Sequence, residues 1–257
     1  MNIRFGCMDL MWGELKAPQF DAWLDEVKAI GFEGVGVRFM YTRQFLQKPT
    51  EFLAKLERCG LSLAAAYAPM DTSEADVRSL CALMKSAGCD NLVMHGYKRG
   101  GSTERTELAR LLNARGEVTR QYGVVTMFHH HTHVPFENLT ETEEQLAITD
   151  PAKVSLFCDT GHATKDFVEV PVAERAVTLL KNNWKRLKMI EFKDWSPETD
   201  LNTELCKGQC GFPAVAALMK ERNYSGWVVL EQNSPSKGST AGECARRSLE
   251  FATKLFN

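Results

Sequence analysis

Residues 29–37 read AIGFEGVGV, and the same order of helix end, glycine and β-rich run recurs three times along the chain. The other copies are RCGLSLAAAY (58–67), SAGCDNLVMH (86–95) and QYGVVTMFHH (121–130). Their glycines, Gly31, Gly60, Gly88 and Gly123, are 29, 28 and 35 residues apart. Glycine suits the left-handed residue that ends a helix, and the apolar run after it suits a strand buried on both faces. The pattern therefore predicts repeated helix–strand units.

The rhythm continues to both ends of the chain. VSLFCD (154–159), LKMIEF (187–192) and WVVLEQ (227–232) are strand-like, and IRFGCMD (3–9) opens the series. These runs bring the total to eight strands in about 250 residues, the size typical of a (β/α)₈ barrel. An open doubly wound sheet usually carries a glycine-rich phosphate loop after its first strand, whereas MDLMWGELKAP has no GxGxxG. We predict an α/β protein with one (β/α)₈ TIM-barrel domain over residues 1–257.

Bulk composition narrows the class of partner. A formal net charge of −2 lacks the basic excess of nucleic-acid binders, and no apolar run approaches the roughly 20 residues that span a bilayer. Met1 to Arg4 enters a strand pattern without a basic-then-apolar leader, and the eight cysteines form no CxxC pair. We therefore expect a cytoplasmic protein with reduced thiols, no nucleic-acid or membrane partner, and the possibility of a homo-oligomer.

Polar residues gather where the last four predicted strands end. The fifth strand ends in HHHTH (129–133), the sixth in Asp159, the seventh in Glu191 and the eighth in Glu231. Active sites of such barrels lie at the carboxyl ends of the strands, and lone charges there are costly to bury. A divalent metal would neutralise three converging carboxylates. The alternative for Asp159 is a helix cap, and for Glu231 a charge at the rim.

Strand geometry divides the histidine run. Alternate residues of a strand face opposite sides, so His129 and His131 share one face and His130 the other. We predict that His129 and His131 face the barrel mouth. His129 is the deeper of the two and the candidate ligand, and His131 is a candidate substrate contact.

On these residues the chain resembles the xylose-isomerase-like TIM barrels, a superfamily of sugar isomerases and epimerases that also contains endonuclease IV. The inosose-dehydratase-like members are the nearest in pattern. The resemblance covers about residues 128–235, through FHHHTH, LFCDTGHA, EFKDW and GWVVLEQN. The first half of the chain matches only in its βα rhythm and around Trp12.

The resemblance implies a metal site on strands five to eight, commonly formed by Glu, Asp, His and Glu. Asp159 and Glu231 match two of these positions directly. Glu191 stands where the family has histidine, and His129 stands on the strand that often supplies Glu. This exchange keeps three carboxylates and one imidazole. His162 matches a histidine that contacts substrate oxygens, and Lys193 matches the lysine beyond strand seven.

This ligand set suits Mn²⁺ best, with Mg²⁺, Co²⁺ or Zn²⁺ as alternatives. The predicted activity is a metal-dependent sugar isomerase or epimerase that acts through a metal-stabilised enediolate. Loss of a β-hydroxyl instead would make it a dehydratase of a keto-inositol or keto-sugar. Glu231 is the candidate base, and Lys193 or His162 the candidate acid. Lys193 could instead be a rim lysine.

Substrate selectivity is expected in the first half of the chain. Trp12, Arg38 and His95 are the candidate contacts there, and Arg38 could equally form a structural salt bridge. An endonuclease is disfavoured because the first 120 residues hold only one histidine, His95. A non-catalytic sugar-binding barrel is a further alternative, since Glu191 departs from the usual ligand.

Overall fold

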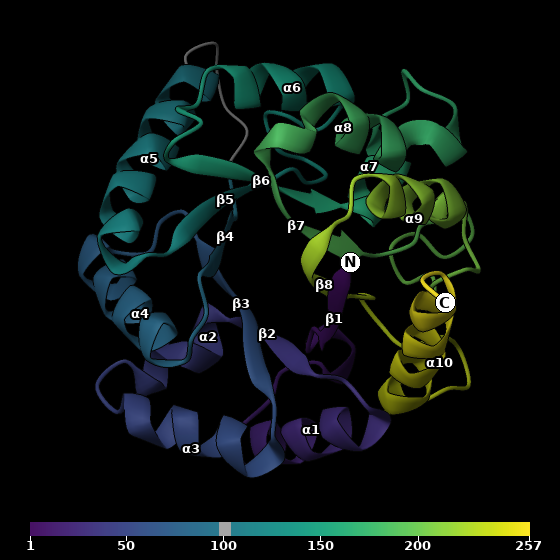
Figure 1. The fold of residues 1–257 in the computed structure, drawn as a ribbon. Coiled ribbons are helices and arrows are strands. Elements are labelled where there is room, and N and C mark those ends of the chain that lie inside the picture. The colour runs from purple at the N-terminus through teal and green to yellow at the C-terminus, as the bar shows by residue number, and fades with distance from the viewer. Residues whose placement is uncertain (98–103) are drawn as a thin grey trace.

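A closed parallel barrel organises the computed structural model, which describes residues 1–97 and 104–257 (Figure 1). Within these residues eight strands pair in chain order, and β8 closes the ring against β1. The (β/α)₈ TIM-barrel prediction is confirmed. The strands are β1 (Asn2–Cys7), β2 (Gly34–Arg38), β3 (Ser62–Pro69), β4 (Asn91–His95), β5 (Val125–His129), β6 (Val154–Asp159), β7 (Leu187–Phe192) and β8 (Ser225–Leu230).

Helices surround the barrel and cover the outer face of the sheet (Figure 1). The α-helices are α1 (Ala17–Ile30), α2 (Phe39–Thr42), α3 (Pro49–Cys59), α4 (Glu74–Ser86), α5 (Glu104–Thr119), α6 (Leu139–Ala147), α7 (Thr160–Asp166), α8 (Arg175–Asn183), α9 (Phe212–Glu221) and α10 (Ala241–Lys254). Short 3₁₀ turns are η1 (Leu10–Trp12), η2 (Arg43–Phe45), η3 (Arg120–Tyr122), η4 (Val172–Glu174) and η5 (Trp184–Arg186).

The four repeated glycines lie where the sequence places them. Gly31, Gly60, Gly88 and Gly123 have positive φ angles of 111°, 59°, 66° and 73°. The Gly31 amide, for example, donates to the Lys28 carbonyl at 3.0 Å and so closes the end of α1. A left-handed residue at this point turns the chain from the helix into the next strand.

Side chains fill the barrel interior below its mouth. A buried cluster there includes Met8, Tyr67 and Phe157, and it is distinct from the larger core between sheet and helices. Gly36 makes room for it, because a Cβ at that position would lie 2.5 Å from the Met8 sulfur and 2.9 Å from the Tyr67 ring. The bare backbone of β2 thus lets Tyr67 reach across the barrel towards β7.

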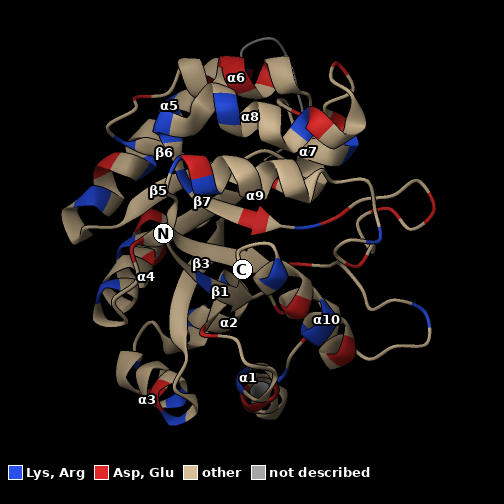
Figure 2. Cartoon of the chain, turned by 45° about the vertical axis from the view of Figure 1, so that its right-hand side comes forward, with Lys and Arg blue, Asp and Glu red and all other residues tan. Residues whose placement is uncertain are grey.

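The outer surface carries both signs of charge. Figure 2 shows Lys and Arg interleaved with Asp and Glu on the surrounding helices, in keeping with the net charge of −2. In the two described ranges, no helix has the length and apolarity that crossing a membrane requires.

Candidate metal centre and active site

Asp159, the last residue of β6, uses its two carboxylate oxygens differently. Oδ1 accepts hydrogen bonds from the backbone amides of Gly161 and His162, at 2.8 and 3.0 Å, and so caps α7. Oδ2 lies 3.4 Å from His129 Nε2 and 3.7 Å from His162 Nε2. Although burial opposes ionisation, His162 and Lys193 hold the pKa of Asp159 well below its usual value. Oδ2 of an ionised Asp159 is therefore directed at two imidazoles. Oδ1 caps the helix, which is the alternative role considered for Asp159 from the sequence.

The histidine run divides as strand parity predicts. His129 and His131 line the cavity at the barrel mouth, whereas His130 packs behind the sheet with its ring 5.2 Å from that of Phe167. His130 Nε2 accepts the backbone N–H of Asp159 at 3.2 Å. His131 Nδ1 lies 2.8 Å from its neighbour's carbonyl, that of Thr132. Because a carbonyl only accepts, His131 carries its proton on Nδ1 and a lone pair on Nε2.

Glu191 on β7 is fully buried and only half satisfied. Its Oε2 accepts a hydrogen bond from the Tyr67 hydroxyl at 3.0 Å, and its Oε1 has no partner among the described residues. Burial raises the pKa of Glu191 well above its usual value, and the carboxylates of Glu231 and Asp159 add to the effect. Arg38, a possible salt-bridge partner for Glu191, is bound to Asp9 instead.

Lys193 and Glu231 form a buried ion pair between the ends of β7 and β8. Lys193 is 2% exposed, so the rim-lysine alternative is wrong. Its backbone amide donates to Thr160 Oγ1 at 2.9 Å, and Gly161 leaves space for its aliphatic chain. Burial alone would lower the pKa of Lys193, but Glu231 and Asp159 raise it, so that the ammonium stays charged.

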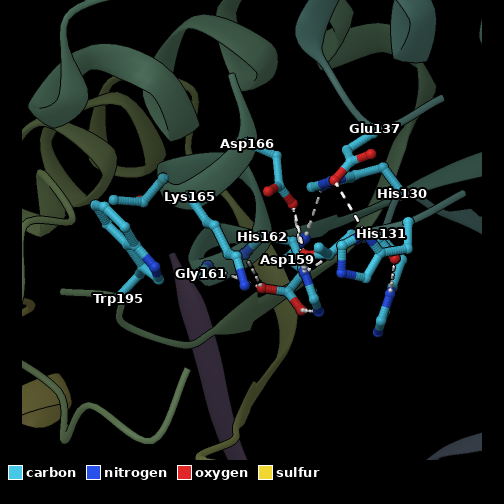
Figure 3. A network of polar contacts seen from close by, with 12 residues as sticks. His130, His131, Glu137, Asp159, Gly161, His162, Lys165, Asp166 and Trp195 are labelled. Atoms are coloured by element: carbon cyan, nitrogen blue, oxygen red, sulfur yellow. Dashed lines mark hydrogen bonds and ion pairs between the residues drawn. The ribbon is translucent and has the colours of Figure 1, made fainter. Parts of the chain in front are cut away.

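His162 belongs to a polar network at the start of α7 (Figure 3). Its Nδ1 lies 2.8 Å from the Thr132 hydroxyl oxygen, which in turn donates to Asp166 Oδ2 at 2.7 Å. The ring centroids of His131 and His162 lie 3.9 Å apart. Thr132 stands within HHHTH at the end of the fifth strand, but threonine was not considered a ligand or a catalytic group there, and Asp166 lies at the far end of α7.

Two overlapping groups of side chains could hold a metal ion. His129, Asp159 and His162 form one, and Asp159, Glu191 and Glu231 form the other, with the ligand atoms of each group within 4.8 Å of one another. Three buried polar atoms here have no partner in the described parts of the chain: His129 Nδ1, His162 Nε2 and Glu191 Oε1. Buried polar atoms without partners are costly, and a divalent cation held by these groups would satisfy those that face it. The donor set therefore fits a metal.

Beside these groups a cavity of about 470 Å³ opens at the barrel mouth. Small-molecule sites typically have this volume. Both halves of the barrel line it, the first half through Arg38, Tyr67 and His95 and the second through His131 and Glu231. Burial, with the nearby His129, lowers the pKa of His95 and of His131 to about 4.

Two first-half residues were candidate substrate contacts, and the structure places them differently relative to the cavity. Arg38 lines the cavity and also forms a salt bridge with the buried Asp9, so both of its proposed roles are compatible with the geometry. Asp9 follows β1 as other acids follow their strands, a signal that could have identified it. Trp12 is not among the residues that line this cavity. Its indole N–H donates to Glu26 at 2.7 Å.

Comparison with known proteins agrees with this architecture. A family model described as "Xylose isomerase-like TIM barrel" matches residues 24–255. An inosose dehydratase from Mesomycoplasma hyopneumoniae is 24% identical over 303 aligned positions, covering 100% of this chain and 97% of that protein. A D-allulose 3-epimerase from Methylomonas sp., solved with D-allulose, superposes with a TM-score of 0.79 at 15% identity, over 99% of this chain and 97% of the other. A xylose isomerase-like barrel from Mycobacterium smegmatis, solved with magnesium, gives 0.77 at 14%, over 98% and 96%.

Proposed function

The chain belongs to the xylose isomerase-like TIM barrel family, and from that premise we propose that it is a metal-dependent enzyme acting on a sugar-like keto-polyol. The proposed step is removal of a proton from the carbon next to a carbonyl. The observation that carries this proposal is that buried nitrogen and oxygen atoms without hydrogen-bond partners converge around Asp159. They lie beside the buried Lys193–Glu231 ion pair. Burial of this many ionisable groups at the mouth of a barrel is typical of an active site.

His129, Asp159, Glu191 and Glu231 are the proposed ligands. Carboxylate oxygens outnumber imidazole nitrogens in this set, which favours Mn²⁺, with Mg²⁺, Co²⁺ and Zn²⁺ as alternatives. When bound, a divalent cation acts as a Lewis acid that polarises a carbonyl and lowers the cost of negative charge on its oxygen. The magnesium in the Mycobacterium smegmatis barrel supports a divalent cation without specifying which one this chain uses.

Glu231 and Lys193 are the proposed base and acid. The Glu231 carboxylate accepts the proton from carbon, and the charged Lys193 donates to an oxygen of the substrate. Glu231 lines the cavity and Lys193 contacts Glu231, so we propose that both act from the same side of a molecule bound there. Proton removal and departure of a neighbouring hydroxyl then take place on one face. This arrangement favours elimination of water.

Dehydration is thus the favoured overall reaction, and the full-length similarity to an inosose dehydratase supports it. Isomerisation or epimerisation is the second candidate, supported by the likeness of the barrel to a D-allulose 3-epimerase. Epimerisation must return the proton to the opposite face. When Glu231 removes the proton, His131 has no Nε2 proton to return, because its neutral ring carries only a lone pair there.

The proposal is tested with purified protein, keto-inositols and ketohexoses in D₂O with Mn²⁺. We expect about one divalent ion per chain and a lower melting temperature after chelation, because a ligand that binds only the native state stabilises it. Deuterium should enter recovered substrate or product, and mass spectrometry should detect loss of water for a dehydratase or an unchanged formula for an isomerase. Glu231→Gln is the control that should abolish exchange.

The metal centre would be refuted if the purified protein is metal-free and added Mn²⁺, Co²⁺ or Zn²⁺ does not stabilise it. Binding of these compounds without exchange would favour the non-catalytic barrel.

Glu191 provides a separate test of the ligand set. In Glu191→Gln the amide oxygen can still accept the Tyr67 hydrogen bond, so the metal-free fold should persist. Removal of the charge should lower metal affinity steeply, as measured by calorimetry. Unchanged affinity combined with a less stable metal-free protein would instead make Glu191 a structural residue.

A further inference from the structure

The imidazole of His162 is held by more polar contacts than a residue that only touches substrate would need. It lies three residues beyond Asp159 on α7 and is 1% exposed. The family resemblance implies that it contacts substrate oxygens. Its two ring nitrogens, however, face very different surroundings, and these surroundings determine what each nitrogen can do.

The Nδ1 side of His162 is held by Thr132 and Asp166. The Thr132 hydroxyl donates to Asp166 Oδ2 at 2.7 Å, which uses the only proton that this hydroxyl has. Towards His162, 2.8 Å away, the same oxygen can therefore only accept, so Nδ1 carries the imidazole proton. The backbone amide of Thr132 also donates to Nδ1, at 3.3 Å, and this longer contact favours a lone pair there, so the Thr132 hydroxyl and amide compete in setting the tautomer.

The Nε2 side of His162 has no hydrogen-bond partner in the described residues. With the proton on Nδ1, Nε2 presents a lone pair to Asp159 Oδ2 at 3.7 Å. A ring-nitrogen lone pair and a carboxylate oxygen are both acceptors, so no hydrogen bond joins them, and a cation between them would contact both. His129 Nε2 reaches the same oxygen at 3.4 Å, and the three ligand atoms lie within 4.8 Å of one another.

We propose that His162 is a ligand of the metal together with His129 and Asp159, and that Thr132 and Asp166 are positioning residues that fix its tautomer. This inference rests on the metal centre of the proposed function. Metal-binding histidines usually donate their second ring N–H to an oxygen, which fixes both the ring orientation and the lone pair. His162 has that support, whereas His129 Nδ1 has none from the described residues.

X-ray absorption of the Co²⁺- or Zn²⁺-loaded protein counts imidazole ligands directly. We expect two in the wild type and one in His162→Gln, with metal affinity lowered at least about tenfold by calorimetry. An unchanged imidazole count and affinity, with only the Michaelis constant for substrate raised, would overturn the inference and leave His162 as a substrate contact. Circular dichroism and melting of the metal-free variant verify that it folds.

The positioning residues are tested with Thr132→Val and its matched control, Thr132→Ser. Valine keeps the shape but removes the hydroxyl, so affinity should fall about 10- to 100-fold, and serine should restore it. Nitrogen-15 NMR of histidine in the metal-free protein should find the proton of His162 on Nδ1 in the wild type. A proton on Nε2, or equal affinities for the two variants, would refute the relay.

The inference can fail independently of the proposed function. If the wild type binds no divalent ion, the proposed metal centre itself is wrong. If the wild type binds metal and Asp159→Asn does not, while His162→Gln still binds with full affinity, the centre stands and only the role of His162 is refuted.

Discussion

The two halves of the barrel bring different chemistry to the same mouth. At the ends of strands β5 to β8 lie residues of metal-binding type, His129, Asp159, Glu191 and Glu231. Two of their buried atoms, His129 Nδ1 and Glu191 Oε1, lack a partner in the described structure. Strands β1 to β4 contribute a self-contained ion pair between Arg38 and Asp9 and a wall with Met8 and Leu10.

The difference lies in how each half satisfies its charges. The Arg38 guanidinium neutralises Asp9, so that pair needs nothing further from outside the chain. In the second half, Lys193 is a single buried ammonium that contacts Glu231 and leaves Asp159 and Glu191 without a comparable partner. We infer that metal affinity depends on the second half, and that the first half governs substrate recognition and stability.

The largest effect is expected for Asp159→Asn, because Asp159 belongs to both candidate ligand groups. Asparagine is as good a helix N-cap as aspartate, so the metal-free melting temperature should change little. Loss of the charged oxygen should lower metal affinity by more than about 100-fold, measured by calorimetry with Mn²⁺ and Zn²⁺. Unchanged affinity would mean that the second half does not hold the ion.

The next largest effect belongs to the first half. Arg38→Met leaves Asp9, which has no solvent exposure, as an uncompensated buried acid, so the free energy of unfolding should fall by about 3 kcal/mol. Metal affinity should not change, whereas the Michaelis constant should rise because Arg38 lines the cavity.

The double variant Asp9→Asn/Arg38→Met is the control for that experiment. Removal of both charges should recover part of the lost stability in urea unfolding. A loss of metal affinity in either variant would contradict the division between the halves.

The same division determines how much of the molecule its sequence predicts. Gly31, Gly60, Gly88 and Gly123 mark the turns of the first half, because a left-handed residue has a strong compositional signature. In the second half, acids after apolar runs identify Asp159 and Glu191, because burial of a charge is unusual enough to be informative. The fold and the candidate ligands could therefore be predicted.

Other residues of the site could not be predicted. Thr132 and Asp166 acquire their roles only when β5 and α7 meet in space, and neither has a distinctive local pattern. Trp12 was a candidate substrate contact in the first half, where the family resemblance extends around it, yet its indole N–H donates to Glu26 on α1. Sequence patterns report burial and turns well, but they do not report which partner a side chain finds across the barrel.

A smaller effect on metal affinity is expected for substitutions of His130, which supports Asp159 in the second half of the barrel. The pairing of β5 with β6 ends at His129 and Phe157, and beyond it the imidazole of His130 accepts the Asp159 amide. His130→Leu should therefore weaken metal binding about tenfold by loosening Asp159, whereas His130→Gln, which keeps an acceptor, should not. Phe167→Leu controls for packing, because Phe167 contacts the same ring. Equal metal affinities for His130→Leu and His130→Gln would mean that His130 only fills the core and does not position Asp159.

The smallest effect concerns pH and the first half. Burial and the neighbouring His129 lower the pKa of His95 to about 4, below the value of about 6.5 for an unfolded histidine. Between these values the unfolded chain binds the proton and the folded chain does not, so stability falls as the pH falls through this window.

His95→Asn removes that contribution. Urea unfolding of the metal-free variant between pH 7 and 5 should therefore lose less stability than the wild type, by at most about 2 kcal/mol at pH 5, since one pKa unit corresponds to about 1.36 kcal/mol. Part of the acid loss should remain, because burial also lowers the pKa of His130 and His131, to about 3 and 4. Parallel curves for the two proteins would mean that His95 accepts protons freely in the folded state. His95 lies on β4, in the first half of the barrel. A changed metal affinity of His95→Asn at pH 7 would therefore show that the first half also contributes to metal binding.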